Sequence, residues 1–180
     1  MADFIALDDR TLIEHARRNT EAFGVLYRRY LTPLYNYLNR RMSNGHEAED
    51  IATQVFIDVL EGLVANRYQE KGCFVAWLFT IARRRLTDFY RQRPSAPLFD
   101  PPSPEPGLLT VIEKGQDLQR LACLLAQLDE DRQELLRLRF SAGLSFAEIS
   151  ALDGRSEAAV KMAVYRTIDF LREHWEIENE

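Results

Sequence analysis

Six of the seven prolines lie between residues 94 and 106, and this cluster constrains the fold more than any other feature of the sequence. They are Pro94, Pro97, Pro101, Pro102, Pro104 and Pro106, and Gly107 closes the segment. Because proline lacks a backbone N–H and breaks helix interiors and central strands, this stretch belongs to neither. We therefore predict a flexible linker over residues 94–115 that joins two domains, 1–93 and 116–180. A polyproline II ligand for an SH3-like partner is the alternative for the same residues.

Apolar residues on both sides of this linker recur at helical spacing, and no stretch shows the sustained alternation that is typical of a strand. Thr11 and Ser145 each precede a glutamate by three residues, which is the spacing of a capping box. The sequence therefore predicts an all-α chain of two small helical domains. Each side of the linker has its own apolar set, so we expect two independent cores whose relative position is set by partners.

The helix predicted over residues 74–92 carries a local basic stripe. Five arginines lie between residues 83 and 93 against one acid, Asp88, on a chain of net charge −5. At 100° per residue, one polar face of this helix holds Arg83, Arg84 and Arg91, with Phe79 and Tyr90 on its flank. Arginines beside aromatic rings suit phosphate contacts and base stacking on an opened strand. The alternative is a solvated basic face with the aromatics in the core.

Two residues of the same helix, Arg85 and Trp77, fall in its apolar stripe. We therefore expect Trp77 to lie in the core and Arg85 to be structural, either snorkelling or paired with Asp88.

Asp153-Gly154-Arg155 is a short turn between two predicted helices, which is the layout of a helix-turn-helix. Such units present the N-terminal turns of their second helix to the major groove of DNA. The candidate contacts on that helix are Ser156, Glu157, Ala158, Lys161 and Met162, and further along it Tyr165 and Arg166. Helix-turn-helix units also serve as plain packing modules, so this pattern alone leaves both interpretations open.

Charge divides unevenly along the chain. Residues 1–93 carry 14 Lys and Arg against 12 Asp and Glu, whereas residues 108–180 carry 9 against 14. The acidic excess argues against a protein that coats nucleic acid through bulk charge. A basic stripe on an acidic chain indicates one confined contact with an anion, and partners that need no positive charge.

Residue patterns also exclude several classes of protein. His15, His46 and His174 are scattered, and there is no phosphate loop, nucleophile elbow or zinc-protease motif. We therefore expect neither an enzyme nor a bound cofactor or metal. No apolar run is long enough to span a bilayer, so no membrane insertion is expected. Cys73 and Cys123 cannot form a disulfide framework, which favours a reducing, cytoplasmic location.

Four segments in order along the chain carry a family resemblance. They read Glu49-Asp-Ile-Ala-Thr-Gln-Val-Phe56, Phe74-Val-Ala-Trp-Leu-Phe-Thr-Ile-Ala82-Arg, Leu144-Ser-Phe-Ala-Glu-Ile149 and Ser156-Glu-Ala-Ala-Val-Lys161. Their order and spacing resemble the sigma-70 family of bacterial RNA polymerase sigma factors, of the extracytoplasmic-function (ECF) type. The resemblance covers roughly residues 20–93 and 118–173. It implies a transcription initiation factor with a region 2 domain in residues 1–93 and a region 4 helix-turn-helix domain in residues 116–180.

The resemblance also implies roles for individual residues. The segment that docks on the clamp helices of core polymerase includes Asp50, Thr53, Gln54 and Phe56, and Thr53-Gln54 stand where Gln-Glu is usual. The base-capturing loop before the basic helix includes Tyr68, Gln69 and Lys71. The helix itself melts and reads the −10 element, with Arg83, Arg84, Tyr90 and Arg91 as contacts, and Arg84 replaces a common Asn. Region 4 reads the −35 element with Ser156–Arg166, where Met162-Ala163 replace a common Ser-Arg and predict weaker or altered contacts.

The partners that follow from this resemblance are core RNA polymerase, through its clamp helices and flap, and promoter DNA. Many relatives are also silenced by an anti-sigma protein. Two alternatives stay open from the sequence. One is a two-domain helix-turn-helix regulator that binds duplex DNA without melting it, and the other is a sigma-like adaptor that docks on polymerase without reading promoters, which the acidic second domain favours.

Overall fold

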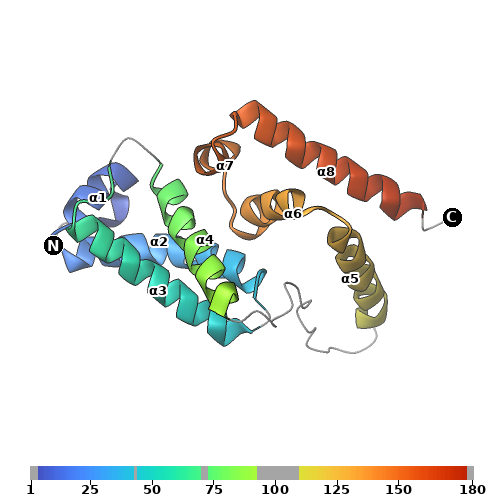
Figure 1. Cartoon of the computed structure of the whole chain (residues 1–180), viewed down its shortest axis with the longest axis horizontal. Coiled ribbons are helices and arrows are strands. Elements are labelled where there is room, and N and C mark those ends of the chain that lie inside the picture. The colour runs from blue at the N-terminus through green and yellow to red at the C-terminus, as the bar shows by residue number, and fades with distance from the viewer. Residues whose placement is uncertain (1–3, 43, 70–72, 93–109, 178–180) are drawn as a thin grey trace.

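The computed structural model describes residues 4–42, 44–69, 73–92 and 110–177, and the regular elements in these ranges are all helical (Figure 1). In chain order they are η1 (Phe4–Ala6), α1 (Asp9–Ala16), α2 (Thr20–Asn39), α3 (Gly45–Val64), α4 (Phe74–Gln92), α5 (Thr110–Ala126), α6 (Glu130–Leu136), the π-helical turn η2 (Arg137–Ser141), α7 (Phe146–Asp153) and α8 (Glu157–Ile177). The prediction of an all-α chain is confirmed. Helix α5 begins before residue 116, where the second domain was expected to start, and the proline segment 94–107 lies outside the described residues.

Helices α1 to α4 form the first domain, in which α2 and α4 both pack against α3 and α1 packs on α2. Each long helix buries residues three or four positions apart, as an amphipathic helix requires. They are Leu34 and Leu38 of α2, Val55, Val59 and Leu63 of α3, and Leu78, Ala82 and Leu86 of α4. Burying one large aliphatic side chain stabilises the fold by about 1.5–3 kcal/mol, so this shared core contributes strongly to holding the three helices together.

Polar side chains at the helix starts fix where the chain becomes helical. Ser145 and Glu148 form the reciprocal capping box expected from their spacing. Asn19 caps α2, as its side-chain oxygen accepts from the N–H groups of Glu21 and Ala22. The box expected at Thr11 is wrong, because Asp8 caps α1 and accepts from the Thr11 N–H at 3.0 Å. Aspartate satisfies the same unpaired N–H one turn earlier.

Helices α5 to α8 form the second domain, and α7 and α8 are the expected helix-turn-helix. Gly154 ends α7 with a φ of 72°, and its N–H bonds the carbonyl of Ser150 at 2.9 Å. A left-handed backbone at this position strains any residue with a Cβ, so glycine allows the sharp turn. Ser156 then accepts from the Ala159 N–H at 3.2 Å and begins α8.

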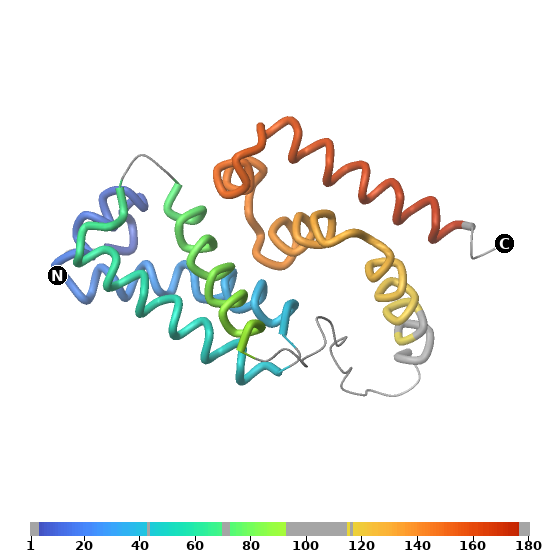
Figure 2. The backbone as a smooth tube through the Cα atoms, in the orientation of Figure 1, coloured from blue at the N-terminus to red at the C-terminus, as the bar shows by residue number. Residues whose placement is uncertain are grey.

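The two domains pack against each other, and their apolar cores are continuous. Helix α4 lies beside α7, and α2 contacts η2 (Figure 2). Buried residues of the second domain, Leu135, Leu138 and Ile149 among them, join the same cluster as those of the first. The expectation of two independent cores is therefore wrong, because η2 and α7 place their apolar side chains against α2 and α4.

Two kinds of feature are absent from the described ranges, a membrane-spanning helix and a metal-binding cluster. None of the helices there is both long and apolar enough to cross a bilayer. The same ranges contain no group of three or more His, Cys, Asp or Glu arranged to hold a metal ion.

Candidate functional site

The outer face of α3 carries an exposed stripe in which polar residues lead into apolar ones. Asp50, Thr53 and Gln54 are exposed, as their predicted role in docking requires. The same face continues with Ile57, Leu60 and Val64, which are 43%, 37% and 65% exposed. We call these six residues the α3 stripe. Exposed aliphatic side chains in a row are typical of a protein-binding surface.

Sequence reasoning missed the apolar half of the α3 stripe because apolar residues of a helix are assigned to its core by default. A signal was present in the helical positions. At 100° per residue, Ile57 and Val64 fall on the face of Asp50, opposite the buried Val59.

Phe56 was expected to touch polymerase, and its position in the structure does not fit that role. Its side chain is buried, and its ring centroid lies 4.7 Å from that of Tyr27 on α2. Tyr27 is itself partly exposed beside the α3 stripe. Phe56 therefore supports this surface from beneath, because its position on α3 points toward α2 rather than toward solvent.

Helix α4 exposes part of the predicted basic face. Arg84 and Arg91 are exposed, together with Thr87 between them and Thr80 one turn before Arg84. Arg91 pairs with Asp88 one turn earlier at 3.1 Å, but its side chain is 75% exposed, so this ion pair leaves the guanidinium accessible. These four residues form a polar strip one helix face wide that can follow a phosphate backbone.

Arg83 does not share that strip, although it was predicted on the same face. Its Nε donates to Glu134 at 3.0 Å, and its Nη1 donates to Asp153 at 2.8 Å. Both acids belong to the second domain. Burial lowers the pKa of the guanidinium, but the charge of Glu134 and the bond to Asp153 outweigh burial, so the net pKa shift is upward. Arg83 is thus a fixed cation at the domain interface, because α7 packs over its side of α4.

The aromatic side chains expected to flank the basic face are part of the protein interior. Phe79 is fully buried and contacts Tyr37 edge-on, with centroids 5.2 Å apart. Tyr90 is half-buried, and its hydroxyl donates to the carbonyl of Arg41. The alternative interpretation, with the aromatics in the core, is correct for Phe79, and α4 offers no stacking ring beside Arg84 and Arg91 among its described residues.

Arg85 is structural, as its place in the apolar stripe predicted, but its partner differs. Its Nε donates to Asp58 on α3 at 2.6 Å, and a second bond joins Nη2 to the other carboxylate oxygen. Asp88 pairs instead with Arg91. The bidentate pair ties α4 to α3.

The predicted base-capturing loop begins in the core. The ring of Tyr68 is buried between Phe74 and Trp77, with centroids 5.8 Å and 5.0 Å away, so the exposure that a DNA contact requires is not found. Arg17 donates to the Tyr68 carbonyl at 3.1 Å. Gln69 is exposed, and Lys71 lies outside the described residues. The aromatic contact across the loop fixes where the loop leaves and re-enters the domain.

Trp77 was expected in the core, and it is half-buried against the adjoining helix. A Cβ at Gly62 of α3 would lie 2.7 Å from its indole ring. Only glycine permits this approach, so Gly62 sets the spacing between α3 and the start of α4.

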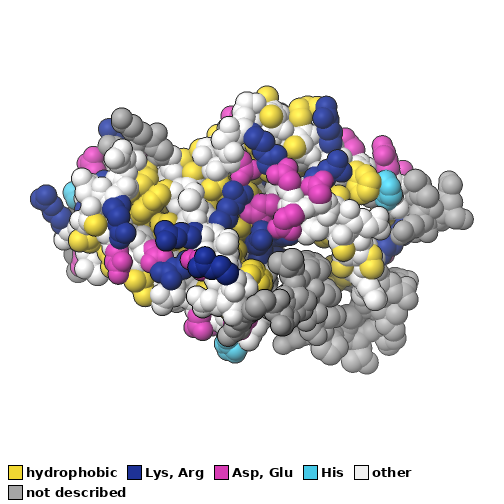
Figure 3. Space-filling view, viewed as in Figure 1, with side chains coloured by type: hydrophobic (Ala, Val, Ile, Leu, Met, Phe, Trp, Pro, Cys, Tyr) yellow, Lys and Arg dark blue, Asp and Glu magenta, His cyan; other side chains and the backbone are white. Residues whose placement is uncertain are grey.

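A cluster of charged side chains lies between the domains and centres on Glu134 of α6. Its carboxylate accepts from the Tyr37 hydroxyl at 2.7 Å, from Arg41 at 2.5 Å and from Arg83 at 3.0 Å. Burial would raise the pKa of Glu134, but Arg41 and its other donors outweigh burial and hold that pKa below its ordinary value. Tyr37 has a raised pKa, through burial first and the charge of Glu134 second. Figure 3 shows acidic and basic side chains gathered where the domains meet.

Helix α8 presents the whole predicted contact set to solvent. The exposed residues are Ser156, Glu157, Ala158, Lys161, Met162, Tyr165 and Arg166. Val160, Val164 and Thr167 are buried on the opposite side, so the helix has one packed face and one open face. The Lys161 ammonium lies 5.8 Å from the centre of the Tyr165 ring. This open face at the second helix of a helix-turn-helix can enter a DNA groove.

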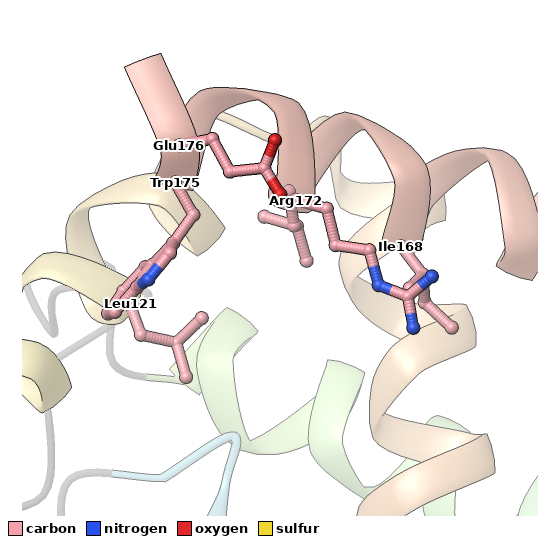
Figure 4. Close-up of a pocket in the computed structure, with 6 residues that line it drawn as sticks. Leu121, Ile168, Arg172, Trp175 and Glu176 are labelled. Atoms are coloured by element: carbon pink, nitrogen blue, oxygen red, sulfur yellow. The ribbon is translucent and has the colours of Figure 1, made fainter. Parts of the chain in front are cut away.

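A shallow apolar cavity of about 230 Å³ lies between α5 and the end of α8 (Figure 4). Its lining consists of Leu121, Ile168, Leu171, Arg172, Trp175 and Glu176. Leu118, one turn before Leu121, is 60% exposed. The second domain therefore has an apolar surface away from its helix-turn-helix.

Comparisons with known proteins match the two domains separately and in order. Residues 26–95 match the model of sigma-70 region 2, and residues 118–171 match the model of sigma-70 region 4. The ECF RNA polymerase sigma factor RpoE of Cereibacter sphaeroides is 31% identical over 176 residues, which cover 96% of this chain and 94% of that protein. The ECF RNA polymerase sigma factor BldN of Streptomyces coelicolor is 30% identical over 168 residues, and this chain covers 62% of its length.

One solved structure shares the fold over nearly the full length. It is that of CnrH in complex with the cytosolic domain of CnrY, and CnrH is similar to this chain with a TM-score of 0.68 and 24% identity. The match covers 94% of this chain and 97% of that one.

Proposed function

The chain belongs to the sigma-70 family of RNA polymerase sigma factors, in its ECF group, and from that membership we propose how its surfaces divide the work of promoter recognition. It is a transcription initiation factor that directs polymerase to promoters. The observation that carries the proposal is the pair of family matches, one on each domain and in the family order. The work takes place in the cytoplasm, where polymerase meets DNA.

The α3 stripe docks on the clamp helices of core polymerase. Its exposed Ile57, Leu60 and Val64 supply apolar contact area, and Asp50, Thr53 and Gln54 supply hydrogen-bonding groups at one end. A mixed surface of this kind gives both affinity and a fixed register on a partner helix. Phe56 supports the stripe and makes no contact of its own.

The first domain opens and holds the −10 element with α4 and the preceding loop. Arg84 and Arg91 contact phosphates of the separated strand, which provides affinity without sequence information. Gln69 and Lys71 are the loop residues proposed to select the captured base. Tyr68 positions that loop from the core.

The second domain reads the −35 element with the open face of α8. Lys161 and Arg166 provide its few cations, and Met162 replaces a polar residue that is common in the family. We therefore expect tolerant −35 recognition that depends on polymerase to hold the domain in place. The apolar surface between α5 and α8 is the proposed contact for the polymerase flap.

A protein inhibitor is a further proposed partner. CnrH was solved with the cytosolic domain of CnrY, and membership of the family brings the expectation of an anti-sigma protein. Such a partner would cover the α3 stripe or the α5–α8 surface, because both expose apolar side chains. Competition between purified core polymerase and a candidate inhibitor for this chain tests the assignment.

Transcription in vitro from genomic DNA tests the function. Core polymerase with this chain should start transcripts at a small set of sites that share −10 and −35 sequences. Core polymerase alone should not. Binding to polymerase without new start sites would favour the adaptor, and specific duplex binding without polymerase would favour the helix-turn-helix regulator.

A further inference from the structure

The charged cluster between the domains engages Arg83, which the basic face of α4 would otherwise present to DNA. We propose that this cluster is an intramolecular latch, in which Glu134 and Asp153 of the second domain occupy Arg83 and withhold its guanidinium from nucleic acid. The role of α4 in DNA binding rests on the proposed function, whereas closure itself does not.

Both acids meet Arg83 at distances that are normal for strong, charge-assisted hydrogen bonds. Its Nε lies 3.0 Å from Glu134 and its Nη1 lies 2.8 Å from Asp153. Two different nitrogens are therefore committed to two different helices, α6 and α7. A guanidinium binds phosphate through the same paired N–H groups, so DNA and the acids compete for one side chain.

Glu134 is the centre of the latch. Its side chain is only 12% exposed and takes hydrogen bonds from Tyr37 of α2, from Arg41 in the turn after α2 and from Arg83 of α4. Arg137, one turn later, donates to it at 3.0 Å. One carboxylate thus neutralises cations of both domains, and the domains cannot separate without breaking three of these bonds.

The latch can be reversible, because a buried ion pair returns part of its energy as solvation when it opens. Desolvation of the charges offsets much of their attraction in the closed state. The continuous apolar core adds attraction between the domains. The net free energy that holds the latch closed is therefore small. Contacts with polymerase and with DNA phosphates can replace the ion pairs and apolar contacts between the domains.

Closure also gives a role to the acidic excess of the second domain. Negative charge on a domain that reads DNA opposes its approach to phosphates, and Glu134 and Asp153 pair only in part within their own domain, with Arg137 and Arg155. Here they face the basic part of the first domain. For a ligand that needs Arg83, the apparent affinity equals the affinity of open molecules multiplied by the fraction of molecules that are open.

Small-angle scattering of the full chain, without polymerase or DNA, tests closure. Glu134→Gln keeps the size of the side chain and removes its charge, and Tyr37→Phe removes one donor. Both should increase the radius of gyration relative to wild type. Asp131→Asn is the matched control, because Asp131 is also on α6 but pairs with Arg155 of its own domain at 2.8 Å. It should scatter like wild type.

Binding of a short, fluorescent oligothymidine tests occlusion. We expect Glu134→Gln to raise its affinity for the chain roughly threefold to tenfold, since only open molecules add Arg83 to the exposed cations of α4. Asp131→Asn makes the same change in net charge and should have a much smaller effect. Adding Arg83→Ala to Glu134→Gln should abolish most of the gain.

Two results would overturn the latch. One is an unchanged radius of gyration for both Glu134→Gln and Tyr37→Phe, with both variants folded by circular dichroism. The other is an equal gain in oligothymidine affinity for Glu134→Gln and Asp131→Asn. Neither measurement uses promoters or polymerase, so failure of the latch is distinguishable from failure of the proposed function.

Discussion

Three consecutive arginines of α4 lie in three different environments. Arg83 binds acids of the second domain, Arg84 is exposed, and Arg85 is paired with Asp58 of α3. Neighbouring side chains of a helix point about 100° apart. The three arginines therefore reach the domain interface, the solvent and the contact between α4 and α3. Helical geometry predicted the structural role of Arg85, but the partner of each arginine depends on how the helices pack.

Replacing Arg85 should affect stability rather than DNA. Its pair with Asp58 is bidentate but about one-third exposed, so we expect Arg85→Ala to cost about 1 kcal/mol. The midpoint of thermal unfolding by circular dichroism should fall by about 2–4 °C. Arg84→Ala, its exposed neighbour, should change the midpoint much less. Loss of promoter opening in Arg85→Ala at unchanged stability would contradict the assignment.

Replacing Arg84 or Arg91 should weaken promoter opening by a similar factor on every promoter. Phosphate contacts carry no sequence information, so the preferred −10 sequence should not change. Each substitution should also reduce the slope of log affinity against log salt by about 0.7, the value for one contact with a single strand. The fraction of heparin-resistant complexes, measured at several salt concentrations, gives both the loss of promoter opening and the salt slope. A changed sequence preference with an unchanged slope would argue for base contacts instead.

Because Glu134 is charged, the stability that it contributes to the contact between the domains should depend on pH. Its pKa in the folded chain lies below the ordinary value of 4.5, so its contribution is present above that value and is lost as pH falls through the folded pKa. The difference in unfolding free energy between wild type and Glu134→Gln, from urea titrations, should be constant above about pH 6 and shrink below pH 4.5. A difference that grew as pH fell would mean that burial dominates and raises this pKa.

At the scale of the element, helical periodicity and capping residues predicted most of the helices. Ser145 and the Gly154 turn act as the sequence indicated, because caps and turns depend on neighbouring residues. Phe56 and Tyr68 were misplaced because an aromatic residue suits both a core and a binding surface. Which one it joins depends on the helix packed beside it, and that contact comes from residues distant in the sequence.

The α3 stripe should carry affinity for polymerase without contributing to stability. Because Val64 is 65% exposed, Val64→Asp should leave the fold intact and weaken binding to core polymerase about tenfold, as for an apolar side chain that is buried on binding. Met162→Asp on α8 makes the same kind of change on another exposed surface, and we expect it to spare that affinity. Surface plasmon resonance against immobilised core polymerase compares the two. Equal losses would mean that α3 has no special part in docking.

At the scale of the whole molecule, the sequence predicted two helical domains but not their contact. The proline segment indicated a division, and the linker over residues 94–115 stays a prediction. Contact between the domains arises from pairs such as Tyr37 with Glu134 and Arg83 with Asp153, which are far apart in the chain. Either acid could equally have paired locally, as Asp153 also does with Arg155. Whether these acids also pair with the first domain depends on how η2 and α7 pack on α2 and α4.

Strand opening at the −10 element is the step that separates a sigma factor from a helix-turn-helix protein that binds closed duplex, and permanganate footprinting measures it directly. On a promoter found by transcription in vitro, core polymerase with this chain should make thymines around position −10 reactive. Core polymerase alone should leave them protected, and the double substitution Arg84→Ala with Arg91→Ala should reduce their reactivity. Bound promoter with unreactive thymines would contradict the account, because this chain would then deliver polymerase to DNA without opening it.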